Sequence, residues 1–111
     1  MEDTHKTNLE KYIGKGKVFI FSKSYCPYCD QAKDLLDALG IKHTSTEVDQ
    51  KTNEFSDAFV QYVNTHAGVR TYPKVYVGEK CIGGFSELQK SADSMKLFAL
   101  LKAEGIAYDD A

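Results

Sequence analysis

The sequence of 111 residues lacks several features that mark whole classes of protein. No apolar run approaches the roughly 18 residues of a membrane helix, and no apolar core follows the start of the chain, so neither a membrane span nor a signal peptide is predicted. Positive charge is not in excess, because the net charge is −2 with both signs interspersed, and this gives no support to nucleic-acid binding. The sequence also has no internal repeat, low-complexity block or linker. We therefore expect one domain over residues 1–111 in a reducing compartment such as the cytoplasm.

Cysteine is also scarce. The chain has three cysteines, Cys26, Cys29 and Cys81, and an odd, small number argues against a secreted disulfide framework. In a reducing compartment, a close pair is more often catalytic or metal-binding than structural. The pair in Ser-Lys-Ser-Tyr-Cys-Pro-Tyr-Cys-Asp, residues 22–30, is therefore the first candidate for chemistry.

Hydrophobic periodicity predicts alternating strands and helices. We expect strands at residues 17–21, 41–48, 74–77 and 80–82, with the last two forming a hairpin. We expect helices at residues 8–13, from Cys26 to residue 39, from an N-cap at Asn53 to Gly68, from Ser86, and at residues 92–103 with Met95, Phe98, Ala99 and Leu101 facing inward. Residues 1–6 are expected to be a polar tail, and the acidic stretch after Gly105 is expected to be loose. An opening strand–helix–strand unit favours parallel pairing and a hairpin is antiparallel, so the predicted fold is α/β, a mixed four-stranded sheet with helices on both faces.

The position of the cysteine pair at the start of a helix predicts a reactive thiol. If Cys26 is the N-cap, Pro27 falls at the first helical position, where its missing N–H costs nothing. The free N–H groups and the positive end of the helix then point at the Cys26 sulfur, and Lys23 adds positive charge nearby. Such a thiol ionises more readily, which suits thiol–disulfide exchange with Cys26 attacking and Cys29 resolving.

Two other interpretations of the pair are weaker. A structural disulfide between Cys26 and Cys29 would close a very small loop and stabilise little. A zinc site needs a second pair of ligands, and Cys81 with the three histidines offers no second Cys-x-x-Cys or His-x-x-x-His spacing. No metal ligand is therefore predicted.

Three motifs together resemble the glutaredoxin family of the dithiol type, over nearly the whole chain. Cys26-Pro-Tyr-Cys29, preceded by Lys23, matches the active-site motif of the family. Thr71-Tyr-Pro73 resembles its Thr-Val-Pro segment, and residues 83–87, Gly-Gly-Phe-Ser-Glu, resemble its Gly-Gly-x-Ser-Asp segment. The resemblance implies a thioredoxin fold, a four-stranded mixed sheet flanked by about five helices. It also implies an oxidoreductase that uses glutathione to reduce protein–glutathione mixed disulfides and protein disulfides.

The resemblance also implies roles for further residues. The Tyr72–Pro73 peptide bond would be cis and face the cysteines, leaving the Tyr72 backbone free to pair with a peptide-like thiol as an added strand. Gly84 would let a ligand approach closely. Ser86 would cap the next helix and bind the γ-glutamyl carboxylate of glutathione, with Glu87 contacting its ammonium. Lys23 and Arg70 are candidates for the glycine carboxylate, and Tyr28 for packing along the ligand.

The chain departs from the family pattern at several positions. Glu87 stands where Asp is usual, and Phe85 where a small residue is common. A glutamine often found in the third helix is replaced by Val60, while Gln61 is one residue later, a rotation of about 100° on a helix. This offset leaves open a larger glutathione-derived thiol of different charge as the partner. Cys81, within an expected strand, is interpreted as a small buried hydrophobic residue, with regulatory oxidation as the alternative.

Other functions stay open at this point. Some relatives hold a [2Fe-2S] cluster between two subunits, using the first active-site cysteine and bound glutathione, although Pro27 would stiffen the loop that a partner must approach. A thioredoxin-like protein that is reduced by an enzyme or by a different small thiol is a further alternative. The expected partners are glutathionylated or disulfide-containing proteins and a small thiol, with no nucleic acid or membrane, and the expected state is a monomer.

Overall fold

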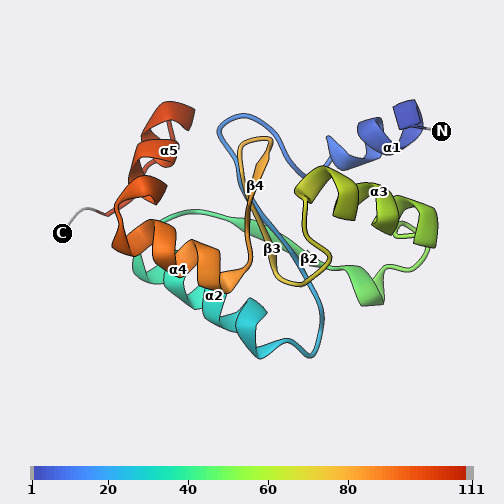
Figure 1. The fold of residues 1–111 in the computed structure, drawn as a ribbon, viewed down its shortest axis with the longest axis horizontal. Helices are drawn as coiled ribbons and strands as arrows, with labels where there is room; N and C mark the ends of the chain where they lie inside the picture. Colours follow the sequence, from blue (N-terminus) through green and yellow to red (C-terminus); the bar gives the residue numbers. More distant parts are fainter. Residues whose placement is uncertain (1, 110–111) are drawn as a thin grey trace.

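The computed structural model describes residues 2–109, with side chains from residue 4 onward, and places helices on both faces of a mixed sheet (Figure 1). The elements in chain order are α1 (Glu2–Leu9), β1 (Val18–Ser22), α2 (Pro27–Ala38), β2 (Thr44–Glu47), a 3₁₀ turn (Val48–Gln50), α3 (Asp57–Ala67), β3 (Lys74–Val77), β4 (Lys80–Gly83), α4 (Phe85–Asp93) and α5 (Lys96–Glu104). None of the helices in this part of the chain is long and apolar enough to cross a bilayer.

The sheet has the strand order β2-β1-β3-β4 and the mixed pairing that the sequence predicts. β1 runs parallel to β2 and antiparallel to β3, and β3 forms a hairpin with β4. Phe21 at the end of β1 lies opposite Lys74 at the start of β3. Cys26 follows β1 and Pro73 precedes β3, so this register brings both segments to the same end of the sheet. The four-stranded thioredoxin-type fold is confirmed.

The two faces of the sheet are covered by different kinds of side chain, because successive residues of a strand point to opposite sides. Ile20, Val75 and Val77 belong to a mainly aliphatic cluster under α2, α4 and α5. Phe21 and Tyr76 belong to an aromatic cluster under α1 and α3. The apolar run of β1 is therefore buried on both faces of the sheet, as the apolar pattern of residues 17–21 predicted.

Several expected boundaries are wrong near the N-terminus and at β2. The first helix spans Glu2–Leu9 rather than residues 8–13, so the stretch expected to be a polar tail is helical from residue 2. β2 is shorter than residues 41–48, because Ile41 donates its N–H to the Leu36 carbonyl at 2.9 Å and is held at the end of α2. The N-cap of α3 is Ser56, whose Oγ accepts the Phe59 N–H at 3.2 Å, and not Asn53. The predicted end of α3 at Gly68 is confirmed by its left-handed φ of 80°.

The C-terminal helical region also differs from the prediction. The expected helix at residues 92–103 is divided between α4 and α5, because the chain turns at Met95 with a left-handed φ of 68°. Met95 is 64% exposed and Ala99 is also exposed, whereas Leu97 and Leu101 are buried. The stretch after Gly105 is attached rather than loose, since the Asp109 N–H donates to the Leu39 carbonyl at 2.8 Å. Residues 110–111 lie outside the described part of the chain.

Candidate active site

Cys26 is the N-cap of α2, as the sequence predicts. Its backbone is extended, with φ −143° and ψ 96°, and Pro27 occupies the first helical turn. The Cys29 N–H donates to the Cys26 Sγ at 3.2 Å. One of the free amides at the helix start is thus aimed at this sulfur, an arrangement that stabilises a thiolate more than a neutral thiol.

The two cysteines differ in accessibility. They are joined in a disulfide, with their Cα atoms 5.1 Å apart. Cys29 is 0% exposed because it faces into the first turn of α2, whereas Cys26 is partly exposed. An external thiol or disulfide can therefore reach Cys26 more readily than Cys29.

The segment before β3 forms the opposite wall of the site. The Tyr72–Pro73 peptide bond is cis, as the resemblance implies, and the Tyr72 carbonyl oxygen lies 3.8 Å from the Cys26 Sγ. Pro73 is buried, and the Tyr72 side chain is partly exposed. The Tyr72 backbone therefore runs beside the reactive sulfur, where an extended peptide can pair with it.

Two lysines lie over the Tyr72 ring. The Lys23 Nζ is 4.8 Å from the ring centroid and the Lys74 Nζ is 3.7 Å from it. Lys74 is fully buried, and its Nζ donates to the Thr71 carbonyl at 3.0 Å. Burial lowers the pKa of Lys74 to about 8. From the sequence, Lys74 is predicted only as the first residue of a strand. A charged residue at the start of an apolar strand, next to Pro73, is the signal that singles it out.

Asp49, which no sequence motif identifies, holds the loop that leads to Cys26. Its Oδ1 accepts the Ser24 N–H at 3.0 Å and its Oδ2 accepts the Ser24 hydroxyl at 2.6 Å. The hydroxyl hydrogen bond is the main cause of the lowered pKa of Asp49, and the nearby Lys23 lowers it further. Ser24 and Asp49 are 25 residues apart, so no local pattern connects them.

The start of α4 differs from the expectation in one respect. The N-cap is Gly84, not Ser86, and the Glu87 Oε1 accepts the Gly84 N–H at 2.8 Å. Glu87 therefore closes the helix start with its own side chain, which Ser86 was expected to do, and Ser86 lies exposed in the first turn. A Cβ on Gly84 would lie 3.3 Å from the Pro73 carbonyl oxygen, so this glycine lets α4 approach the cis-proline segment closely.

An aromatic pair connects α2 with α4 beside the cysteines. The rings of Tyr28 and Phe85 stack with centroids 6.3 Å apart, and Tyr28 is 62% exposed. Tyr25, in the loop before Cys26, is 97% exposed. Together these rings form an apolar border around the active site, and the contribution of Phe85 to it was not predicted.

Arg70 lies three residues after the end of α3. It lines a polar hollow of about 570 Å³ at the end of α3, together with Gln61 and Asn64. Val60 is half-buried against the aromatic cluster that Tyr72 also contacts. The one-residue offset of the glutamine is therefore present in the structure, because Gln61 faces this hollow while Val60 faces the core.

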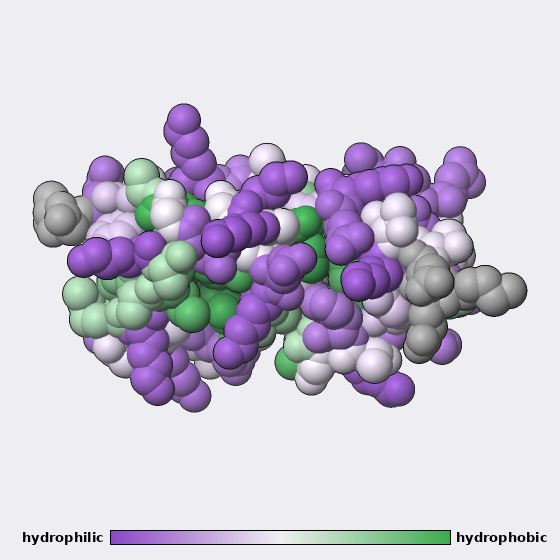
Figure 2. Space-filling view, turned by 90° about the horizontal axis from the view of Figure 1, so that it is seen from above, coloured by the Kyte–Doolittle hydropathy of each residue, from purple (hydrophilic) through white to green (hydrophobic). Residues whose placement is uncertain are grey.

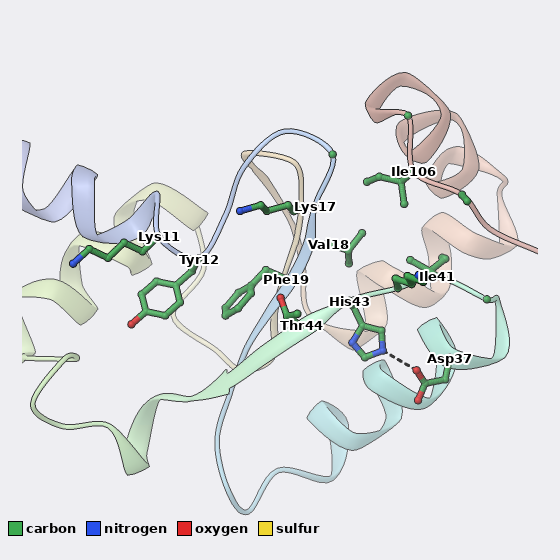
Figure 3. A pocket seen from close by; sticks show the side chains of 15 residues that line it. Lys11, Tyr12, Lys17, Val18, Phe19, Asp37, Ile41, His43, Thr44 and Ile106 are labelled. Atoms are coloured by element: carbon green, nitrogen blue, oxygen red, sulfur yellow. Dashed lines mark hydrogen bonds and ion pairs between the residues drawn. The ribbon is translucent and has the colours of Figure 1, made fainter.

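A larger hollow, of about 1020 Å³, lies at the other end of the sheet (Figure 3). Val18, Ile41 and Ile106 surround one side of it, and His43 in its wall pairs with Asp37 at 2.9 Å. From above, hydrophobic side chains show between hydrophilic ones near the middle of the surface (Figure 2). None of the predicted site residues lines this hollow, so cavity size does not locate the chemistry here.

A family model for glutaredoxin matches residues 18–82, which include the cysteine pair and the cis-proline segment. The chain belongs to the glutaredoxin family. Human glutaredoxin-1 is 38% identical over 94 residues, covering 84% of this chain and 89% of the relative. The glutaredoxin of Ricinus communis is 35% identical over 101 residues, covering 89% and 95%. The crystal structure of a buckwheat glutaredoxin–glutathione complex superposes with a TM-score of 0.78 at 32% identity, covering 95% of this chain and 96% of that one.

Membership in the family, with the dithiol pair in place, makes this glutaredoxin a thiol–disulfide oxidoreductase. Within residues 2–109, the structure contains no group of three or more histidine, cysteine or acidic side chains placed to hold a metal ion.

Proposed function

We propose that this glutaredoxin uses glutathione to reduce protein–glutathione mixed disulfides and protein disulfides, with Cys26 as the nucleophile and Cys29 as the resolving thiol. The observation that carries the proposal is the contrast between the two sulfurs. The Cys26 Sγ is accessible and accepts the Cys29 N–H, while Cys29 is closed off from solvent.

Stabilisation of the Cys26 thiolate by the start of α2 improves Cys26 as a leaving group more than as a nucleophile. A free thiol with a pKa of about 8.5 is about 3% thiolate at pH 7. Lowering that pKa by about two units raises the thiolate fraction roughly 25-fold, whereas intrinsic nucleophilicity falls about 8-fold for a Brønsted slope near 0.45. The net gain in attack is only about threefold, so the larger benefit comes when the Cys26 sulfur is displaced in the next step.

In the proposed cycle for a mixed disulfide, the Cys26 thiolate attacks the glutathione sulfur. The disulfide of the substrate breaks, and the protein thiolate leaves and takes a proton. A second glutathione thiolate then attacks the glutathione bound to Cys26, forming glutathione disulfide and restoring the Cys26 thiolate.

For a protein disulfide, Cys26 first forms a mixed disulfide with the substrate protein. The Cys29 thiol then loses its proton and attacks the Cys26 sulfur, which releases the second substrate thiol. The product is the Cys26–Cys29 disulfide, the form that the structure contains, and two glutathione molecules reduce it.

Recognition of glutathione is proposed for the wall opposite α2. The Tyr72 backbone beside Pro73 supports strand-like pairing, and Gly84 allows close approach. The first turn of α4, with Ser86, is proposed to bind the γ-glutamyl carboxylate through its N–H groups. Glu87 keeps one carboxylate oxygen beyond the Gly84 contact for the ammonium. We propose that Lys23 and Arg70 bind the glycine carboxylate of glutathione and that Tyr28 packs along the ligand.

The proposal is tested by comparing several small thiols as reductants of one glutathionylated peptide, side by side. Glutathione, a glutathione derivative amidated at its glycine, and a plain alkyl thiol form a useful panel. Glutathione is expected to support the fastest turnover. Turnover by a flavoenzyme reductase but not by glutathione would contradict the proposal. Faster turnover with the amidated thiol would identify the Val60 offset as a change in specificity.

A further inference from the structure

Lys74 is a buried charged residue that the proposed cycle does not use. It is 0% exposed, at the start of β3, and on the same face of the sheet as Tyr76. A lysine whose stem is covered usually keeps its ammonium in water, because an ammonium removed from water without a counter-charge is costly. Among the described residues, the ion pairs do not include Lys74. A cationic group kept under these conditions next to a reactive site is a candidate for a part in its function.

Lys74 contacts the residue whose carbonyl oxygen lies beside Cys26. Its Nζ donates to the Thr71 carbonyl at 3.0 Å and lies 3.7 Å from the centroid of the Tyr72 ring. Both partners precede Pro73, so one ammonium holds the whole cis-proline segment from the side of the aromatic cluster. The Tyr72 carbonyl oxygen is in turn 3.8 Å from the Cys26 Sγ.

The ionisable groups around Lys74 come from several elements. Lys23, in the loop between β1 and α2, shares the Tyr72 ring and lowers the pKa of Lys74, while the Cys81 thiol of β4 raises it. Asp49 interacts with Tyr72 and Lys23, and on the α3 side the Tyr76 hydroxyl is paired with His66 at 2.9 Å. Burial is the largest influence and brings the pKa of Lys74 to about 8. Lys74 is therefore roughly nine-tenths protonated at pH 7 and loses its charge at mildly alkaline pH.

We propose that Lys74 is a positioning residue, whose ammonium holds the Thr71 carbonyl and the Tyr72 ring so that the Tyr72 backbone faces Cys26 and aligns a substrate disulfide for attack. This inference rests on the proposed function. A neutral amine can still donate a hydrogen bond to Thr71 but loses its attraction for the ring. The rate of the first exchange should therefore fall as pH rises through the pKa of Lys74.

The experiment measures single-turnover transfer of glutathione from a glutathionylated peptide to reduced protein, by acid quench and mass spectrometry, from about pH 5.5 to about pH 10. No free glutathione is present in this step, so the ionisation of the small thiol does not enter. Four proteins are compared: wild type, Lys74→Arg, Lys74→Met and Lys80→Met. Lys80 is an exposed residue of the same hairpin, and its substitution removes the same charge without touching the site.

The wild-type rate is expected to rise as Cys26 ionises and then to fall above about pH 8. Lys74→Arg should keep the neutral-pH rate and lose the alkaline fall, because a guanidinium stays charged throughout. Lys74→Met should be about tenfold slower at pH 7 and show no alkaline fall. Lys80→Met should follow the wild type.

A purely structural role would lower the melting temperature of Lys74→Met without moving the alkaline fall. The same alkaline fall in Lys74→Arg, or a wild-type rate and profile in Lys74→Met, would overturn the inference. If circular dichroism shows that Lys74→Met does not fold, the comparison of Lys74→Arg with wild type still decides. A wild type that accepts no glutathione at any pH refutes the proposed function, whereas an active wild type with an unchanged Lys74→Arg profile refutes only the role of Lys74.

Discussion

The two walls of the active site are built in different ways. On one side, Cys26, Pro27, Tyr28 and Cys29 are contiguous, and their geometry follows from the start of one helix. On the other side, two segments that are distant in the sequence meet: the cis-proline segment, and residues 83–87, which run from the end of β4 into the first turn of α4. The first wall carries the cysteine pair, and the second is the wall proposed above to bind glutathione. Chemistry is thus encoded locally, whereas recognition depends on how distant segments pack.

Loss of the attacking sulfur tests the first wall most severely. Cys26→Ser should reduce both deglutathionylation and protein disulfide reduction to background, because no other described cysteine is placed to replace it: Cys81 lies in β4, partly buried, with its thiol pKa raised by burial. Cys29→Ser should keep deglutathionylation, which needs one thiol, and lose dithiol reduction. Steady-state assays on a glutathionylated peptide and on a disulfide-bonded protein distinguish these outcomes.

An active Cys26→Ser protein would contradict the role assigned to that sulfur. Equal loss of both reactions in Cys29→Ser would show that Cys29 takes part in attack as well as in resolution.

A second prediction concerns the electrostatics of the same wall. The pKa of the Cys26 thiol should lie below 7, about two pH units under that of a free thiol, because the α2 amides stabilise the thiolate. Iodoacetamide alkylation of the reduced protein across pH, read by mass spectrometry, gives the midpoint for each cysteine. Cys81 serves as an internal control, since burial raises the pKa of its thiol. A midpoint near 8.5 for Cys26 would refute the prediction.

The difference between the walls also decides how much of the site could be predicted. The N-cap at Cys26 was predictable, because a proline at the first helical position and the apolar stripe behind it are local signals. At α4 the local signals compete: Gly84, Ser86 and Glu87 can each contribute to a helix start. The expected cap at Ser86 was wrong because Gly84 is held next to Pro73, 11 residues earlier, and its N–H is satisfied by Glu87.

The same reasoning applies to the fold. β1 and β3 were predictable from their apolar residues, and the end of α3 from the glycine at position 68. The bounds of β2 were wrong, because Thr44–Glu47 contains no apolar run. The turn at Met95 was not, because a left-handed methionine has no local sequence signal. Met95 and Ala99 were therefore wrongly expected to face inward, whereas Leu101 is buried and Phe98 packs against the aliphatic cluster, as expected. Lys74 and Asp49 act through contacts with Tyr72 and Ser24, so their roles emerge only when the sheet brings those segments together.

The last prediction concerns the contact between the two walls and has the smallest expected effect. Phe85 of α4 stacks on Tyr28 of α2 and extends the apolar border beside Cys26. Phe85→Ser should lower kcat/KM about threefold for glutathionylated peptides with an aromatic residue next to the cysteine, and leave a peptide with serine there unchanged. Met95→Ser, at an exposed apolar residue between α4 and α5, is the control. Equal changes for both peptides would mean that the Tyr28–Phe85 pair supports the structure of the site and does not select among protein substrates.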